Sequence, residues 1–181
     1  MRVIAGRLRN RRLLSPRNRS IRPVMDGVKE YIFNVISERV EGAEVCDLFA
    51  GTGSLGIEAL SRGSARVTFV DVAAESARII RANLENLGIA ADASVVREEA
   101  FRFAHRTPAR PYDIVFCDPP YGFAGTEKII GELIADGVVS PGGIVVAEHE
   151  AELLLPERIG PFLRLRQRSF GRTTISMFGS G

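Results

Sequence analysis

Short apolar runs alternate with segments of helical periodicity along most of this 181-residue chain. Strands are predicted at residues 45–49, 66–70, 93–96, 112–117 and 143–147, and helices at residues 55–61, 74–87, 100–105 and 126–135. Because a helix between two strands joins them in parallel, this order predicts an α/β fold built on a parallel sheet with helices on both faces. Runs such as Ile114-Val115-Phe116 suit a sheet that is covered on both sides.

Two further elements frame this alternating region. A helix is predicted from Asp26, a candidate N-cap, to residue 40, because apolar residues recur there at intervals of three and four. Residues 162–170 and 173–178 predict an antiparallel hairpin near the C-terminus, which a mostly parallel sheet can accept. We expect residues 26–181 to form one domain.

The first 25 residues carry a single sign of charge. They contain eight arginines and no acidic residue, so their charge of +8 leaves −6 for the rest of a chain with a net charge of +2. Arginine suits phosphate contacts and stacking on bases. We interpret residues 1–25 as an RNA-binding arm that contains a small β-hairpin; a basic tail without a partner is the alternative. The candidate RNA-binding residues are Arg2, Arg7, Arg9, Arg11, Arg12 and Arg22.

A glycine-rich loop, Gly51-Thr52-Gly53-Ser54-Leu55-Gly56, follows the strand predicted at residues 45–49. Glycines allow a tight turn and a close approach of the backbone to a ligand, and the start of the following helix attracts an anionic group. Asp71 ends the next predicted strand, where a carboxylate can accept hydrogen bonds from ribose hydroxyls. The pattern predicts a site for an adenosine cofactor.

Asp47 favours one adenosine cofactor over another. A carboxylate beside the loop would repel the pyrophosphate of a nicotinamide dinucleotide, whereas it suits the ammonium group of S-adenosylmethionine. We therefore predict S-adenosylmethionine, with a nicotinamide dinucleotide as the alternative. Glu98 and Glu99 are candidates for the adenine edge or, equally, ordinary acidic residues at a helix start. The candidate cofactor-binding residues are Asp47, Phe49, Gly51, Thr52, Gly53, Asp71 and Glu99.

Asp118-Pro119-Pro120-Tyr121 directly follows the strand predicted at residues 112–117. Two prolines remove two backbone donors and end the strand. The exocyclic amine of a base is a poor nucleophile. Asp118 and the carbonyl of Pro119 can each accept a hydrogen bond from one of its two N–H groups. Tyr121 can stack on a base that has left its helix or loop. These four residues are the predicted catalytic residues; a strand-ending turn capped by aspartate is the alternative.

Methyl transfer requires the two motifs to lie side by side. Ligands of open α/β sheets bind at the carboxyl ends of the strands, and both motifs follow strands. We therefore expect the glycine loop and residues 118–121 at one edge of the sheet.

Cys46 and Cys117 lie in apolar runs and are expected to be buried free thiols. The spacing of cysteines and histidines predicts no metal site.

Other short sequences accompany these motifs along nearly the whole chain: Arg2-Val3-Ile4-Ala5-Gly6, Arg22-Pro23, Lys29-Glu30, Phe33-Asn34, Glu58-Ala59-Leu60-Ser61-Arg62-Gly63, Asn83 and residues 171–175. Together they resemble the bacterial 16S ribosomal RNA guanine-N2 methyltransferases of the RsmD type. The resemblance implies a Rossmann-like class I methyltransferase fold with a mostly parallel seven-stranded sheet. It also implies S-adenosylmethionine as cofactor.

By this resemblance the substrate is the N2 amine of one guanine in 16S rRNA, presented within an assembling small ribosomal subunit. We expect a cytoplasmic monomer with no membrane segment, since no run reaches the roughly 18 apolar residues that a span requires. An adenine-N6 methyltransferase is the alternative enzyme, because the tetrapeptide at residues 118–121 suits either amine. A non-catalytic RNA-binding assembly factor is the alternative outside enzymes.

Overall fold

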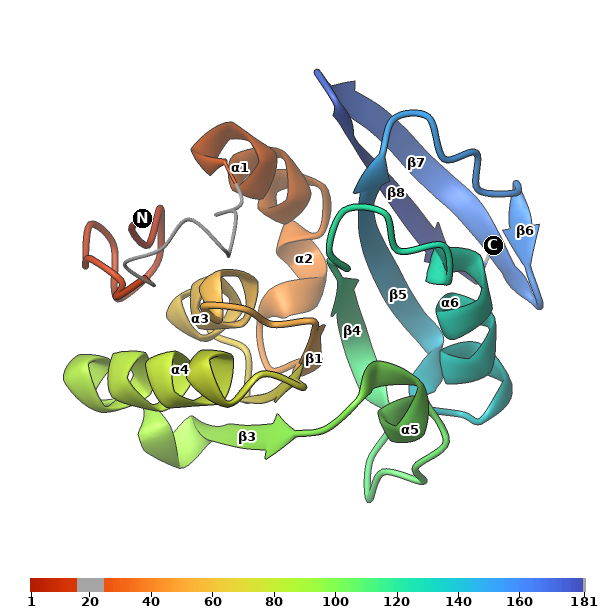
Figure 1. Ribbon diagram of the computed structural model, residues 1–181. Coiled ribbons are helices and arrows are strands. Elements are labelled where there is room, and N and C mark those ends of the chain that lie inside the picture. The colour runs from red at the N-terminus through yellow and green to blue at the C-terminus, as the bar shows by residue number, and fades with distance from the viewer. Residues whose placement is uncertain (16–24, 181) are drawn as a thin grey trace.

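The computed structural model describes residues 1–15 and 25–180. One sheet runs through the molecule in the order β3-β2-β1-β4-β5-β8-β7-β6 (Figure 1). Its strands are β1 Glu44–Leu48, β2 Arg66–Asp71, β3 Ala93–Arg97, β4 Tyr112–Cys117, β5 Val139–Glu150, β6 Arg158–Ile159, β7 Phe162–Phe170 and β8 Thr173–Gly179. β1 to β5 pair in parallel, and β8, β7 and β6 continue the sheet in antiparallel pairs. The predicted α/β fold with an antiparallel hairpin is confirmed.

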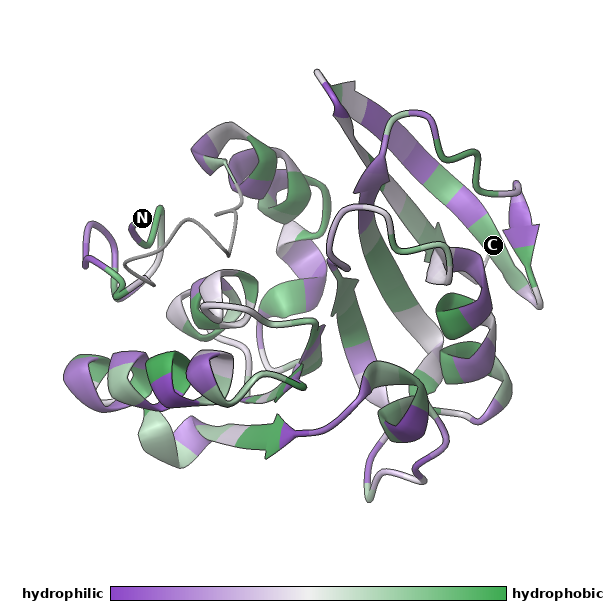
Figure 2. Ribbon diagram, in the orientation of Figure 1, coloured by the Kyte–Doolittle hydropathy of each residue, from purple (hydrophilic) through white to green (hydrophobic). Residues whose placement is uncertain are grey.

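Helices cover both faces of this sheet, as predicted (Figure 1). They are α1 Asp26–Val35, α2 Ser37–Val40, α3 Ser54–Ser61, α4 Ala74–Leu87, α5 Ala100–Ala104 and α6 Thr126–Ala135, with a 3-10 turn, η1, at Ala90–Asp92. The first four helices share a core with Val45 and Phe116. α5 and α6 pack with Cys46 and Val115 on the other face. Neighbouring strand residues thus serve opposite cores, and β4 and the central part of β5 are apolar (Figure 2).

Two elements differ from the sequence prediction, the first helix and the end of the sheet. The helix predicted from Asp26 to residue 40 is divided at Ile36, whose backbone leaves the helical region. Met25 rather than Asp26 occupies the N-cap position, and the Asp26 carboxylate instead pairs with Arg2 at 3.2 Å. The two-residue β6 pairs with the start of β7, so the sheet has eight strands among the described residues.

The N-terminal segment folds onto the domain. Its predicted hairpin is present as one antiparallel bridge, between Arg2 and Arg12. The backbone N–H groups of Ile4 and Ala5 donate to the two carboxylate oxygens of the buried Glu58, at 2.8 and 3.0 Å. The ammonium of Lys29, also fully buried, donates to the carbonyl of Arg2 at 2.7 Å. Buried charges are tolerated where they are hydrogen-bonded in this way, so the segment and the helices α1 and α3 stabilise one another.

Gly56 makes the tightest contact between α3 and the sheet. A methyl group at this position would lie 2.3 Å from the ring of Phe69 and 2.8 Å from the side chain of Val67. In contrast, a methyl group at Gly131 of α6 would meet its nearest neighbour at 3.7 Å. The two helical glycines therefore differ in the space available to a side chain.

We predict opposite effects of alanine at these two glycines. Gly56→Ala should lower the free energy of unfolding by about 1–3 kcal/mol, because the added methyl overpacks the core. Gly131→Ala should raise it by up to about 1 kcal/mol, because alanine favours the helix and nothing opposes it. Urea unfolding of both variants measures the difference. A stabilised Gly56→Ala protein would contradict the packing described for α3.

Candidate active site

A cavity of about 710 Å³ opens at the carboxyl ends of the central strands. Its wall includes both sequence motifs: the loop residues Gly51 and Thr52, and residues 118–121. Four more of the predicted cofactor residues, Asp47, Phe49, Asp71 and Glu99, line the same cavity. The structure therefore brings together the two motifs that the sequence places 62 positions apart, counted from Gly56 to Asp118.

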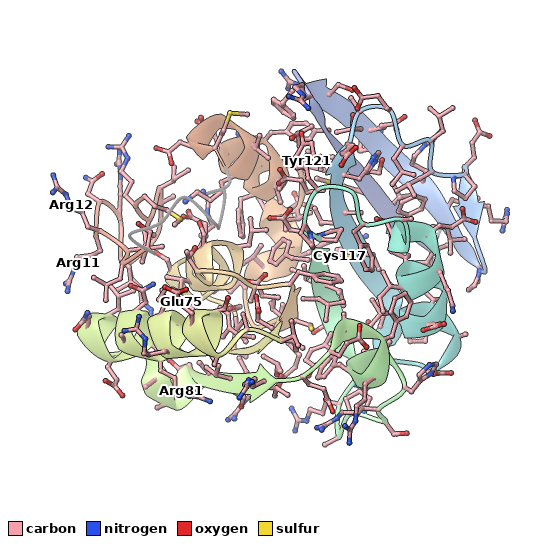
Figure 3. All side chains as sticks on the ribbon, viewed as in Figure 1. Arg11, Arg12, Glu75, Arg81, Cys117 and Tyr121 are labelled. Atoms are coloured by element: carbon pink, nitrogen blue, oxygen red, sulfur yellow. The ribbon has the colours of Figure 1, made fainter. Side chains whose placement is uncertain are left out.

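The pairing of β1 with β4 produces this proximity. Leu48 stands opposite Cys117 in the parallel register, so both strands end at the same level. The backbone N–H of Asp118 then donates to the carbonyl of Leu48 at 3.4 Å. Figure 3 labels Cys117 at the end of β4 and Tyr121 in the segment that follows it. The tetrapeptide thus leaves the sheet directly beside the strand that leads into the glycine loop.

Asp47 is the most deeply buried acid of the cavity wall. Only 2% of its surface is exposed, and one carboxylate oxygen accepts the N–H of Gly56 at 2.9 Å. The pKa of Asp47 is raised from 3.8 to about 7, mainly because burial disfavours the charged form; the Gly56 hydrogen bond lowers the pKa and the charge of Asp71 raises it. A cationic ligand group beside Asp47 would favour the ionised carboxylate again.

Asp71 holds the glycine loop from the neighbouring strand. One of its carboxylate oxygens accepts the N–H of Gly51 and the other that of Ala73, both at 2.8 Å. Each oxygen of a carboxylate has two acceptor positions, so Asp71 keeps capacity for ligand hydroxyls. Its position at the end of β2 is the one predicted for a ribose-binding acid.

Two residues of the loop region have unusual backbone conformations. Phe49 has a φ of 61°, a left-handed conformation that strains a residue with a side chain. Gly53 has a φ of 77°, but it does not line the cavity. A side chain on Gly53 would instead meet Phe69 and Ile80, at 3.1 and 3.2 Å. Gly53 therefore lies on the core side of the turn, whereas Gly51 lines the cavity.

Aromatic side chains form one side of the cavity. The ring of Phe49 contacts that of Phe123 edge-on, with centroids 5.1 Å apart. Phe123 lines the cavity and also lies 6.0 Å from the ring of Phe101. Such a wall suits the flat, apolar faces of an adenine ring. Phe123 was not predicted, although its position two residues after Tyr121 was a usable signal.

Glu98 and Glu99 serve the protein as well as the cavity. Glu99 is the N-cap of α5, and its side chain accepts the N–H of Arg102 at 3.0 Å. Glu98 pairs with Arg102 and Arg106, at 3.2 and 2.8 Å. Both glutamates nevertheless line the cavity. The helix-start interpretation holds, and it leaves open a second role at the adenine edge.

The tetrapeptide is held in place by segments that the sequence did not connect with it. The Tyr121 hydroxyl donates to the carbonyl of Arg172 at 3.1 Å, and Tyr121 as a residue remains 47% exposed. The N–H of Gly122 donates to Glu150 at 2.5 Å. Glu150 and Thr173, at the ends of β5 and β8, line the cavity too. Their contribution depends on the antiparallel pairing of β8 with β5, for which no local sequence signal exists.

Five of the predicted RNA-binding arginines are described, and these five lie outside the cavity wall. Arg2 and Arg7 pair with Asp26 and Asp92, each at 3.2 Å, and Arg11 donates to the carbonyl of Asn86 at 3.2 Å. Arg9 and Arg12 are exposed, and Figure 3 labels Arg11 and Arg12 at the margin of the fold. Arg22 lies outside the described residues.

Asn83 of α4 joins the N-terminal segment to the glycine loop. Its amide nitrogen donates to the carbonyl of Thr52 in the loop and to the carbonyl of Leu14, both at 3.2 Å. Its amide oxygen accepts the N–H of Leu14 at 2.7 Å. Because Asn83 is almost fully buried, these three hydrogen bonds fix the loop and the segment relative to each other.

Several expectations concern other parts of the protein. Cys46 and Cys117 are buried free thiols, as predicted. In the part of the chain that the structure describes, no group of three or more histidine, cysteine or acidic residues could hold a metal ion. No helix within residues 1–15 and 25–180 combines the length and apolar character needed to cross a membrane.

The raised pKa of Asp47 predicts a pH dependence of stability. The folded state favours the protonated carboxyl, so the stability that this group contributes is complete below about pH 4 and is lost as the pH rises to about 7. Asparagine can accept the Gly56 hydrogen bond without ionising. Between pH 5 and pH 8, wild-type protein should lose about 2–3 kcal/mol more of its unfolding free energy than Asp47→Asn. Urea unfolding at both pH values measures this difference, and equal losses would contradict it.

Comparisons with known proteins place this geometry in a wider group. The family model described as "Conserved hypothetical protein 95" matches residues 1–179. Ribosomal RNA small subunit methyltransferase D of Haemophilus influenzae is 35% identical over 182 residues, which cover 98% of this chain and 93% of that protein. The Escherichia coli protein of the same name is 35% identical and covers 98% of this chain and 89% of its own length. The solved structure of yhhF from Escherichia coli is 31% identical with a TM-score of 0.88, covering 98% of this chain and 96% of that chain.

Proposed function

The chain belongs to the conserved hypothetical protein 95 family, and we propose that it is an S-adenosylmethionine-dependent methyltransferase of small-subunit ribosomal RNA. The observation that carries this function is the cavity wall shared by the glycine loop and residues 118–121. The relatives named ribosomal RNA small subunit methyltransferase D support the choice of RNA. We assign the methyl group to the N2 amine of one guanine in 16S rRNA.

The residues of the cavity fit S-adenosylmethionine. The Ser54 hydroxyl is buried at the start of α3 with no hydrogen-bond partner among the described residues, and Ser54 lines the cavity. Asp47 is a buried carboxylate suited to the cofactor ammonium, and Asp71 suits its ribose hydroxyls. Phe49 and Phe123 would flank the adenine ring. When bound, the cofactor supplies an electrophilic methyl group.

Residues 118–121 would prepare the guanine amine for attack. The amine nitrogen is weakly nucleophilic because its lone pair is delocalised into the ring. The Asp118 carboxylate and the Pro119 carbonyl would each accept a hydrogen bond from one N–H group of the amine and so orient the lone pair of its nitrogen. Tyr121 would stack on the base, its ring oriented by the hydroxyl contact with Arg172. As the N–C bond forms, the amine becomes acidic and Asp118 can take its proton.

The basic arm would hold the RNA outside the cavity. Among the described residues of the arm, Arg9 and Arg12 are the arginines whose exposed guanidinium groups form no ion pair or hydrogen bond, so they are the best placed to meet phosphates. Arg2, Arg7 and Arg11 would have to exchange a protein contact for an RNA contact. We further propose that the protein acts as a monomer in the cytoplasm, on rRNA within an assembling small subunit.

Asp118→Asn tests the proposed chemistry. We predict that it lowers methyl transfer from labelled cofactor to unmodified rRNA by at least about 100-fold, the scale of general acid–base effects, while RNA binding stays unchanged. Asp113→Asn is the matched control on the same strand. Asp113 lies at the opposite end of β4 and accepts the N–H of Glu44 at 2.9 Å, so its variant should retain transfer.

The same reaction identifies the product. Digestion of the methylated rRNA should release N2-methylguanosine as the modified nucleoside. N6-methyladenosine in its place would establish the adenine alternative. RNA binding without any methyl transfer by the wild-type protein would leave a non-catalytic assembly factor.

Arg9→Gln combined with Arg12→Gln tests the arm. Both side chains are exposed, so folding should be preserved. If both contact phosphates of unpaired RNA, the slope of log affinity against log salt should fall in magnitude by about 1.4, or 0.7 for each contact. Filter binding at several salt concentrations measures the slope. A slope equal to that of the wild type would contradict the assignment of these two arginines.

A further inference from the structure

Within the part of the chain that the structure describes, β7 is an open edge along most of its length, and it carries several arginines. β8 pairs with it from Leu163 to Phe170, whereas β6 pairs only with Phe162 and Leu163. Beyond that short contact β7 is strongly hydrophilic (Figure 2). Three exposed arginines, Arg166 and Arg168 on β7 and Arg172 in the turn to β8, are named here the hairpin arginines.

The hairpin arginines keep their charge available. Within residues 1–15 and 25–180, none of their guanidinium groups forms an ion pair with a carboxylate. Arg164, earlier on the same strand, differs because it pairs with Glu157 at 3.8 Å and donates to the carbonyl of Leu155. The Arg166 guanidinium donates to the carbonyl of its neighbour Leu165 at 3.2 Å, but this contact leaves its charge without an acidic partner. Exposed arginines without an acidic partner, beside one that has such a partner, indicate a surface that meets an anionic partner.

The sheet register places two of these arginines on one face. Arg166 stands opposite Met177 and Arg168 opposite Ile175, and opposed residues of an antiparallel pair share a face. Met177 and Ile175 belong to the core covered by α1. The Arg168 guanidinium lies 5.0 Å from the ring centroids of both Tyr31 and Phe170. Stacking on two rings holds the group in position while its N–H edges remain available.

Arg172 connects this surface with the cavity. Its carbonyl accepts the Tyr121 hydroxyl at 3.1 Å and the N–H of Ala151 at 3.0 Å. Its guanidinium lies 5.7 Å from the centroid of the Tyr121 ring. The next residue, Thr173, lines the cavity. The row of charges therefore runs along the hairpin to the predicted base-stacking residue.

We propose that the hairpin arginines form a second RNA-binding surface, which contacts phosphates of the strand that flanks the methylated nucleotide. This inference rests on the proposed function, because it assumes that a base enters the cavity beside Tyr121. A flipped base brings its own phosphates to the cavity mouth, where Arg172 lies. Charged residues also protect open strand edges from pairing with other chains, so the experiment must separate the two roles.

The test compares two triple variants that each lose three positive charges. One is Arg166→Gln, Arg168→Gln and Arg172→Gln. The control is Arg39→Gln, Arg66→Gln and Arg110→Gln, which alters exposed arginines at the amino ends of the parallel strands. Arg39 donates to the carbonyl of Gly142, Arg66 begins β2, and Arg110 precedes β4 and lies 4.0 Å from the carboxylate of Glu44. Tyr121 keeps its contact in the first variant, because the carbonyl of Arg172 is backbone.

Affinity for small-subunit rRNA is measured with S-adenosylhomocysteine present, over a range of salt concentrations. In the hairpin variant, the slope of log affinity against log salt concentration should fall in magnitude by about 2. Its affinity at 0.1 M salt should fall about 10- to 100-fold. The control variant should keep the wild-type slope. A triple Arg→Lys hairpin variant should also keep it, because the slope depends on charge.

Equal slopes and affinities for the hairpin and control variants would overturn the proposal. A second result would also overturn the proposal: the hairpin variant self-associates, and its monomeric fraction keeps the wild-type RNA affinity. The arginines would then serve to protect the open strand edge from pairing with other chains. Failure of the proposed function is a separate result. It would be an absence of methyl transfer by the wild-type protein, whereas this comparison depends on binding alone.

Discussion

The parallel pairing of β1 with β4 is the constraint on which the rest of the site depends. The two strands end level with each other, so the chain leaves the sheet twice at one place. The first departure becomes the glycine loop and the second becomes the acid, proline, proline and tyrosine corner. A shift of this register by one residue would turn Asp47 and its neighbours to the opposite faces of the sheet. The apolar residues that alternate between the two cores prevent such a shift.

Much of this arrangement could be predicted from local sequence. β4, α4 and α6 have the predicted bounds, because their periodicity is clear and Gly88 ends α4 in a left-handed conformation. β6 escaped prediction because two residues carry no periodicity. The division of the first helix at Ile36 was not predicted, because apolar residues continue at helical spacing on both sides of Ile36. Asp26 suited an N-cap by type, but a partner 24 residues away takes its carboxylate.

The residues of the candidate site likewise divide into those that the sequence predicted and those that it did not. The residues that local motifs predicted line the cavity, except Gly53, which faces the core. Glu150, Thr173 and the carbonyl of Arg172 come from β5, β8 and the turn before β8, and the order of these strands in the sheet differs from their order in the sequence. The basic arm was predicted from its charge, but its anchoring was not. That anchoring depends on the buried Glu58, Lys29 and Asn83, three polar residues in helices whose partners lie far away in the sequence.

The order of the last strands has a consequence for synthesis on the ribosome. β8 lies between β5 and β7, although it follows β7 in the chain. All seven of its residues are buried, and until they are synthesised the sheet lacks the strand that joins β7 to β5. A nascent chain that has already exposed β7 must wait for β8 before β7 can join the sheet. Folding of this half is therefore completed after translation of β8, and the earlier parallel strands present an unpaired edge at β5 in the meantime.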